Sequence, residues 1–229
     1  MVVGIMDNRI DNQTMAAQKC HKTPGRVGVM ADSHGQVRAL AAGIAMLQGQ
    51  GCDTLYHLGD ICDSAFPETT RDCLALIAEH HVLAVKGNNE HTIAVNFQDY
   101  EDDPEAILLA SFLERLPLVR SYESAVFAHS LPFENELGLS AMVRIMEPLA
   151  ANLFFNMYPG QVLFRGHGHT PEIIYPRDGR AATRSLPVDE TICLSELRPC
   201  VVTCGALMDG LCLVWDTAGD WIRLLSCPA

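Results

Sequence analysis

Apolar and polar residues alternate along residues 26–90 in blocks whose lengths are typical of strands and helices. The apolar run Arg26–Ala31 predicts a buried strand. Leu40, Ile44 and Leu47 then recur at the spacing of one helix face, and Gly49 ends that helix. The same reasoning predicts a strand over 54–58, a helix from Pro67 to about His80, and a strand over 82–85. The order strand, helix, strand, helix, strand predicts an α/β fold.

The second half of the chain predicts further elements and then changes character. We expect an acidic loop over 98–105, a helix over 104–116, a strand over 124–128, a long helix over 140–157 and a strand over 161–164. Short apolar runs over 191–197, 200–203, 211–215 and 221–225 are separated by turn residues, which predicts an antiparallel meander. Residues 1–25 carry no such pattern, so they are interpreted as a flexible N-terminal arm before one domain over 26–229.

The composition favours a globular protein and disfavours some classes of partner. Hydrophobic residues make up 48% of the 229 residues and charged residues 19%, enough for a sizeable core. The net charge of −12 argues against nucleic-acid or anionic-membrane partners. A small phosphorylated substrate stays compatible, because bound cations would reverse the local field. No apolar run reaches membrane-span length, and nine cysteines without a CxxC pair indicate a reducing, cytoplasmic setting.

Five polar clusters each follow a predicted strand. They are Asp32-Ser33-His34-Gly35, Gly59-Asp60, Gly87-Asn88-Asn89-Glu90, His129-Ser130 and Gly166-His167-Gly168-His169-Thr170. In open α/β sheets, functional groups gather beyond the carboxyl ends of the strands. We therefore expect all five clusters at one edge of the sheet.

The residue types in these clusters are those that bind transition metals, namely carboxylate, amide oxygen and imidazole. Two divalent ions about 3.5–4 Å apart require a group that contacts both, and a carboxylate with two oxygens serves this purpose. Asp60 is the candidate bridging ligand. One ion would take Asp32, His34 and His169, and the other Asn88, His129 and His167.

Taken singly, each of these residues has an ordinary structural interpretation. Asp32 and Asp60 suit turns or helix caps, Asn88 suits a left-handed turn, and His129 suits a buried loop. The pair His167 and His169 is the hardest to explain without a ligand. The order of all five clusters after strands therefore favours a metal site.

The series D-x-H, GD, GN, H and GHxH resembles the calcineurin-like metallophosphoesterases, in particular their small bacterial and archaeal phosphodiesterases. The resemblance covers about Val27 to Leu225 and includes Val202-Thr203-Cys204-Gly205-Ala206-Leu207, which is similar to a late strand-turn of the family. It implies a four-layer sandwich of two mixed β-sheets flanked by helices. It also implies two divalent ions, which in the family are manganese, iron, zinc or nickel.

Three positions depart from the family pattern. Asn89 stands where many members have a histidine that assists the leaving group or binds phosphate. An asparagine at this catalytic position can donate a hydrogen bond but cannot deliver a proton. Gly168 replaces the commoner threonine and Cys204 the usual asparagine. The arginine typical of the phosphoprotein phosphatase branch is absent after Gly59-Asp60.

The resemblance implies a metal-dependent phosphoric ester hydrolase, a phosphodiesterase or phosphatase that uses in-line attack by a metal-bridging hydroxide. The alternative is a non-catalytic metal-binding or protein-interaction scaffold on the same fold. A nuclease would require a basic groove, which 16 Lys and Arg against 28 Asp and Glu disfavour.

Some residues near the clusters are given other roles. His57 is interpreted as structural, and His91 remains an alternative pocket residue. The segment after His129 contains a further set of large apolar residues: Phe133, Met142, Met146, Phe154, Phe155 and Met157. We expect core or oligomer packing for this set rather than a substrate cap, so a homo-oligomer stays open.

Overall fold

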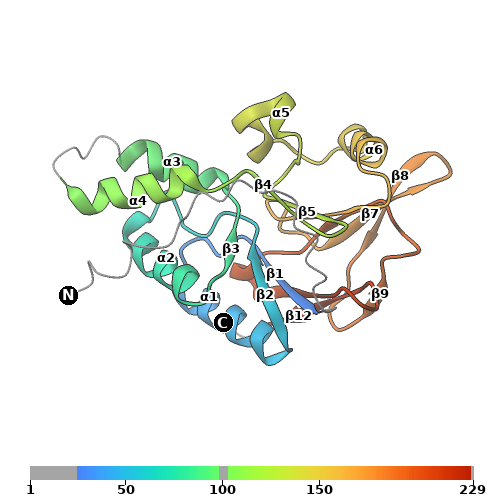
Figure 1. The fold of residues 1–229 in the computed structure, drawn as a ribbon, viewed down its shortest axis with the longest axis horizontal. Helices are drawn as coiled ribbons and strands as arrows, with labels where there is room; N and C mark the ends of the chain where they lie inside the picture. Colours follow the sequence, from blue (N-terminus) through green and yellow to red (C-terminus); the bar gives the residue numbers. More distant parts are fainter. Residues whose placement is uncertain (1–24, 98–102, 228–229) are drawn as a thin grey trace.

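The computed structural model describes residues 25–97 and 103–227 as a mixed α/β fold in layers (Figure 1). Its α-helices are α1 (Val37–Gly49), α2 (Thr70–Glu79), α3 (Asn88–Phe97), α4 (Pro104–Arg115), α5 (Glu134–Leu137) and α6 (Pro148–Met157). Its strands are β1 (Arg26–Met30), β2 (Cys52–His57), β3 (Leu83–Ala84), β4 (Val119–Tyr122), β5 (Ala125–Ala128), β6 (Val162–Arg165), β7 (Glu172–Arg177), β8 (Arg180–Ser185), β9 (Thr191–Cys193), β10 (Cys200–Thr203), β11 (Leu211–Asp216) and β12 (Trp221–Ser226).

The strands form two six-stranded mixed sheets. The first has the order β3-β2-β1-β11-β12-β9, in which β1, β2 and β3 are parallel and the others pair antiparallel. The second has the order β4-β5-β6-β10-β7-β8, in which β5, β6 and β10 are parallel. Strands β1, β5, β6 and β10 are buried on nearly every residue, as expected for parallel strands covered on both faces.

Three hydrophobic cores join four layers. The outer face of the first sheet packs against α1 to α4, the two sheets pack against each other, and the outer face of the second sheet packs against α6. The predicted architecture of two mixed sheets flanked by helices is therefore confirmed. The functional clusters, however, follow β1, β2 and β3 of one sheet and β5 and β6 of the other. The expectation of a single sheet edge was wrong, because the site lies where the carboxyl ends of both sheets meet.

An aromatic stack crosses between the sheets. Phe127 on β5 is fully buried, and its ring lies parallel to that of Tyr56 on β2, with centroids 3.9 Å apart. On its own sheet Phe127 also stacks on Phe164, at 5.5 Å. This arrangement fixes how the two sheets sit on each other and hence how their strand ends meet.

We expect Phe127→Ala to lower the free energy of unfolding by about 3–5 kcal/mol, because it leaves a cavity between rigid sheets. Urea unfolding at 25 °C measures this loss. Phe66→Ala is the matched control, because Phe66 is 62% exposed and its truncation is expected to change the free energy by no more than about 0.5 kcal/mol. Equal urea midpoints for the two variants would contradict the packing described.

The prediction of one long helix over 140–157 is wrong. A 3-10 turn covers Gly138–Met142, and α6 begins only at Pro148. Proline has no N–H to continue a helix, and it holds the preceding residue extended, as Glu147 is here with φ −87° and ψ 164°. Of the apolar set expected here, five are buried and one is exposed. Phe133, Met142, Met146, Phe154 and Phe155 are buried, whereas Met157 is 45% exposed.

The predicted antiparallel meander is only partly present. Strands β9, β11 and β12 pair antiparallel in the first sheet, but β10 joins the second sheet and runs parallel to β6. All four residues of β10 are buried, and such a strand gives no sequence signal for its neighbours. Helix α3, strand β4 and the hairpin β7–β8 were not predicted.

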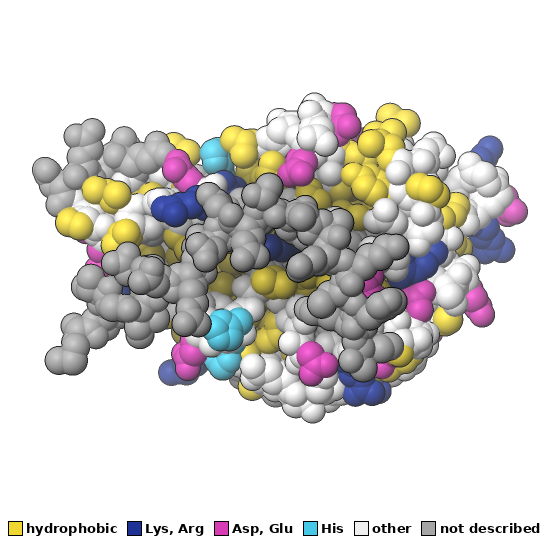
Figure 2. Space-filling model, viewed as in Figure 1, with side chains coloured by type: hydrophobic (Ala, Val, Ile, Leu, Met, Phe, Trp, Pro, Cys, Tyr) yellow, Lys and Arg dark blue, Asp and Glu magenta, His cyan; other side chains and the backbone are white. Residues whose placement is uncertain are grey.

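Several further predictions concern the chain as a whole. No helix among the described residues is long and apolar enough to span a membrane. No disulfide joins the cysteines within residues 25–97 and 103–227. The predicted arm falls on residues 1–24, which lie outside the described part of the chain, and on Gly25. Side chains coloured as hydrophobic gather on the surface around α6 (Figure 2), where Leu149 is 81% exposed.

Candidate metal centre

The loops that carry the predicted ligands share an uncommon backbone conformation. Five of the seven predicted residues have positive φ angles although none is glycine: Asp32, His34, Asp60, His167 and His169. Such conformations cost energy and cluster at functional sites. The loops hold one another, since the His34 N–H donates to the Asp60 carbonyl at 3.0 Å and the Gly166 N–H to the His129 carbonyl at 3.0 Å.

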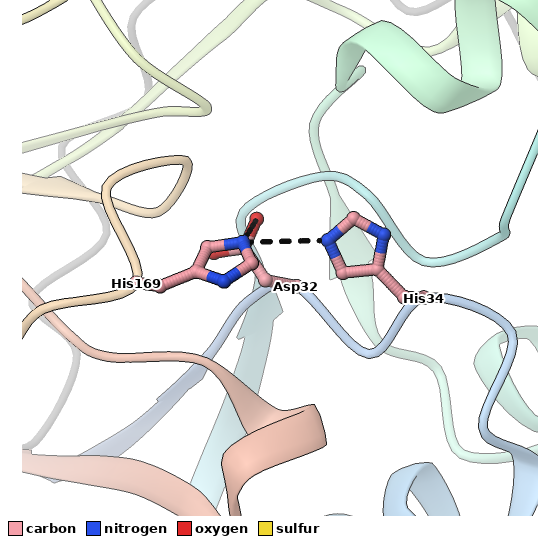
Figure 3. Close-up of side chains that lie close together, drawn as sticks. All are labelled: Asp32, His34 and His169. Carbon is pink, nitrogen blue, oxygen red and sulfur yellow. Dashed lines mark hydrogen bonds and ion pairs between the residues drawn. The ribbon is translucent and has the colours of Figure 1, made fainter.

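One group of side chains consists of Asp32, His34 and His169. The Nε2 atoms of the two histidines are 3.4 Å apart, and His169 Nε2 lies 3.6 Å from Asp32 Oδ1. Figure 3 shows one nitrogen of each imidazole ring pointing toward the other ring, with the Asp32 carboxylate beside His169. One ligand atom from each residue lies within 4.8 Å of the others, a spacing that suits a shared metal ion.

A second group consists of Asp60, His129 and His167, again with ligand atoms within 4.8 Å of one another. His129 Nε2 lies 3.2 Å from His167 Nδ1 and 3.6 Å from Asp60 Oδ1. Asn88, the first residue of α3, places Oδ1 3.1 Å from His129 Nε2. All seven residues predicted as ligands are thus brought into two neighbouring groups.

Asp60 lies between the two groups. Its Oδ2 is 3.9 Å from His34 Nε2, and its Oδ1 is 3.6 Å from His129 Nε2. The side chain is only 4% exposed, so the carboxylate is fixed within the site. This is the position that a carboxylate shared by two ions would occupy.

The tautomer of His129 supports cation binding. Its Nδ1 is 2.8 Å from the Leu58 carbonyl oxygen, which can only accept, so Nδ1 carries the proton. Nε2 then presents a lone pair toward Asp60 Oδ1 and Asn88 Oδ1, which are acceptors as well. Lone pairs that converge on one point repel unless a cation lies there. A backbone carbonyl that fixes the tautomer in this way is typical of metal-binding histidines.

Without a bound metal, the surroundings of the site disfavour the charged forms of several of the predicted ligands. Burial, with the nearby negative charge of Asp60, raises the pKa of Asp32 to about 8. Burial lowers the pKa of both His129 and His167. The histidines are therefore held neutral, as ligation requires, and the positive charge of Arg165 offsets only part of the effect of burial on Asp32.

A buried arginine, which the sequence analysis did not single out, lies under the last loop. Arg165 is 3% exposed and donates to the Ser130 carbonyl oxygen and hydroxyl and to Thr203 Oγ1. A Cβ atom at residue 168 would lie 3.1 Å from its Nη1. A side chain at position 168 would therefore press on the Arg165 guanidinium, and glycine avoids this close contact.

Two more predicted positions can be placed. The turn containing Cys204 leads into residues that hold the first loop, since the Leu207 N–H donates to the Ala31 carbonyl at 2.8 Å. The Cys204 thiol itself is buried and contacts the Gly205 carbonyl, so it supports the turn. His57 is buried with Nε2 3.0 Å from Ser33 Oγ, and burial lowers its pKa to about 3, in keeping with a structural role.

The Gly87–Glu90 segment contains two side chains with unexpected contacts. Glu90 is fully buried, and its carboxylate accepts hydrogen bonds from the N–H groups of Asp60, Cys62 and Gly87. The predicted catalytic residue Asn89 contacts Asp60 and Ser64. The His91 N–H donates to the Gly87 carbonyl at 3.3 Å, and a role for its side chain stays a prediction.

Glycine at position 87 is needed for this arrangement. A Cβ atom there would collide with the backbone nitrogen and the carboxylate of Asp60. The sequence signal was the Gly87-Asn88-Asn89-Glu90 cluster itself, but the acceptor role of Glu90 depends on loop contacts that no spacing rule describes.

Relatives of known sequence and structure agree with this architecture. Over 161 residues, the chain is 25% identical to an uncharacterized protein of Methanocaldococcus jannaschii, and the match covers 63% of each chain. The chain thus spans less than two thirds of the length of that relative.

Among solved structures, it is similar to a metallophosphoesterase from Sphaerobacter thermophilus, with a TM-score of 0.70, 18% identity and coverage of 90% and 89% of the two chains. It is also similar to a protein serine/threonine phosphatase from Saccharomyces cerevisiae, with a TM-score of 0.51, 13% identity and coverage of 90% and 81%. At these identities the two structures show the fold alone.

The family model of the calcineurin-like phosphoesterase superfamily domain matches residues 26–182, which include every one of the seven predicted ligands. The chain therefore belongs to the calcineurin-like phosphoesterase superfamily.

Proposed function

We propose that this chain is a metal-dependent phosphoesterase that hydrolyses small phosphate esters. The observation that carries the proposal is the position of Asp60, whose two oxygens face two groups of ligand atoms. Asp32, His34 and His169 would hold one divalent ion, and Asn88, His129 and His167 the other, with Asp60 shared. Imidazole nitrogens mixed with carboxylate and amide oxygens suit manganese, iron, zinc or nickel better than calcium.

The chain's own residues prepare the site for an anionic substrate. When bound, two divalent ions would supply Lewis acidity toward water and toward the phosphoryl oxygens. The protein contributes orientation, because the buried Asp32 and Asp60 carboxylates are held by backbone N–H groups of His167 and Asn89. It also contributes neutral imidazoles, since burial keeps His129 and His167 from being protonated.

Metal analysis and a substrate screen test this proposal directly. Purified full-length protein should contain two equivalents of a divalent transition metal and hydrolyse one or more of an aryl diester, an aryl monoester and a nucleotide. Removal of the metal by a chelator should abolish hydrolysis, and its return should restore it. Protein that retains two metals but hydrolyses none of these substrates would instead support the scaffold alternative.

The proposal also predicts how metal affinity depends on pH. Because the pKa of Asp32 is raised to about 8, its carboxyl group is mostly protonated at pH 7 in the metal-free protein, and a metal must displace that proton. Affinity should therefore rise about fivefold from pH 7 to pH 8 and less than about twofold from pH 8 to pH 9.

Anaerobic competition titration of Mn²⁺ against a chelator measures this dependence, after correction for protons bound by the chelator. Asp32→Asn is the control, because it removes the titrating group. That variant should bind more weakly and lose the rise between pH 7 and pH 8. A wild-type affinity that is equal at the two pH values would contradict the role given to Asp32.

A further inference from the structure

We propose that Asn89 is a positioning residue that holds the Asp60 carboxylate in the orientation needed by both groups of ligands. This inference rests on the proposed phosphoesterase function. It replaces the role in leaving-group departure that the family resemblance implies for this position. The contacts of the Asn89 side chain and backbone carry the argument.

Residue 89 binds both oxygens of the same carboxylate. Its backbone N–H donates to Asp60 Oδ1 at 2.9 Å, and its side-chain Nδ2 donates to Asp60 Oδ2 at 2.8 Å. Two donors on two different oxygens fix the plane of the carboxylate as well as its position. The orientation matters here because Oδ1 faces His129 and Oδ2 faces His34.

The amide of Asn89 is itself held from behind. Ser64 donates to Asn89 Oδ1 twice, from its backbone N–H at 2.9 Å and from its hydroxyl at 2.6 Å. A backbone N–H can only donate, so the amide oxygen must face Ser64 and the amide nitrogen must face Asp60. The hydrogen bonds therefore run in one direction, from Ser64 to the Asn89 oxygen and from the Asn89 nitrogen to Asp60.

These contacts argue against a role at the leaving group. Asn89 is 8% exposed, and turning its amide toward a substrate would break the bond to Asp60 and both bonds from Ser64. Bonds to a charged acceptor are among the stronger hydrogen bonds in proteins. Asn89 thus joins the first turn of α3 to the loop that carries Asp60 and Ser64.

Positioning and leaving-group assistance predict different patterns of loss. A group that assists departure matters most for strongly basic leaving groups, so its removal steepens the dependence of log kcat/KM on leaving-group pKa. A group that positions Asp60 affects metal binding and lowers kcat/KM equally for all esters. The two roles can be separated in one variant.

The experiment compares wild type, Asn89→Ala and Ser64→Ala in the full chain. Mn²⁺ affinity is measured by chelator competition, and kcat/KM is measured for aryl esters spanning a range of leaving-group pKa at saturating metal. Asn89→Ala should weaken Mn²⁺ binding about tenfold, as expected for loss of one hydrogen bond to a charged acceptor. It should lower kcat/KM by one common factor. Ser64→Ala, which keeps its backbone N–H, should show a smaller loss in the same direction.

Unchanged Mn²⁺ affinity together with a steeper leaving-group dependence would overturn the proposal. A wild type that neither binds metal nor hydrolyses any ester would defeat the proposed function instead. In that event urea unfolding of Asn89→Ala, Asp60→Ala and the double variant still decides whether Asn89 holds Asp60. Non-additive changes in the free energy of unfolding support the contact, and additive changes overturn it. The same cycle with Ser64→Ala in place of Asn89→Ala serves if Asn89→Ala does not fold.

Discussion

Replacing Asp60 with alanine is expected to abolish both metal binding and phosphoester hydrolysis. Within the described residues, the Asp60 carboxylate is placed against both ligand groups, 3.9 Å from His34 Nε2 and 3.6 Å from His129 Nε2. No neighbouring side chain can take its place, because the other ligands are divided between the two groups. Elemental analysis after gel filtration should find almost no metal bound to the variant. Hydrolysis should fall at least about 10³-fold, the scale of losing a metal-based contribution to catalysis.

Two further variants make this result interpretable. Asp53 is exposed near the opposite end of β2, so Asp53→Ala removes the same charge without touching the site and should keep both metals and activity. Asp60→Asn keeps the shape of the side chain and one oxygen, and it should retain the fold while losing most of the metal affinity. An Asp60→Ala protein with a native circular dichroism spectrum and two bound metals would show that the ions are not shared through Asp60.

The α/β class of the fold could be predicted because its signals are local. Helix α1 places Leu40, Ile44 and Leu47 on its buried face, as their spacing indicates. Asp32 follows the apolar residues 27–31, whereas the strand before Asp60 is mixed, since Thr54 and His57 interrupt its apolar residues. Parallel strands end at the same side of a sheet, which was enough to place Asp32, Asp60 and Asn88 together. The ligands that follow β5 and β6 belong to the second sheet, and strand order alone does not predict how the two sheets meet.

Pairing between distant strands could not be predicted in this way. Strand β10 is buried on both faces, so its residues fit either sheet equally well, and its parallel register with β6 depends on the packing of the whole sandwich. The prediction of a helix over 140–157 was wrong for a reason that is visible in the sequence. Pro148 fits the first turn of a helix but not its interior.

The hydrogen bonds that support the predicted ligands could not be predicted from the sequence either. Glu90, Arg165 and Ser64 each act through hydrogen bonds to backbone or amide groups that are far away in sequence. Those partners are brought close by loops with positive φ at Asp60 and His167, a conformation that Asp and His adopt more readily than most residues but that their presence in the sequence does not require. A sequence motif identifies the residue types at the site. It does not describe the loop conformations that bring residues distant in sequence into hydrogen-bond contact.

Glu90→Ala is expected to cause a loss of stability at least as large as that of Phe127→Ala, because three buried backbone donors depend on one carboxylate. The carboxylate is fully buried and accepts three backbone N–H groups, from Asp60 at 2.8 Å, Cys62 at 2.9 Å and Gly87 at 2.8 Å. Alanine would leave all three donors without this acceptor. At about 1–3 kcal/mol for each unsatisfied buried group, the loss is about 3–9 kcal/mol, against a total of about 5–15 kcal/mol for a typical domain.

We expect a loss near the lower end of the range of about 3–9 kcal/mol, because burying the Glu90 carboxylate in the wild-type protein itself costs free energy. Burial and the charge of Asp60 raise the pKa of Glu90, which shows that the fold must accommodate a carboxylate in an unfavourable environment. Removing the carboxylate relieves that penalty and offsets part of the lost hydrogen bonding. Glu90→Gln keeps one acceptor oxygen for Asp60 and Gly87 but turns an amide N–H₂ toward Cys62. Its loss should therefore be smaller than that of Glu90→Ala.

Urea unfolding of the metal-free proteins measures these losses separately from metal binding. Glu79→Ala is the matched control, since Glu79 is exposed at the end of α2 and its truncation should change the free energy by no more than about 0.5 kcal/mol. We expect the order Glu79→Ala, Glu90→Gln, Glu90→Ala from most to least stable. A Glu90→Ala protein as stable as the Glu79→Ala protein would mean that the loops after β2 and β3 are held by other contacts. Asp60 and Asn88 would then owe their relative placement to the sheet alone.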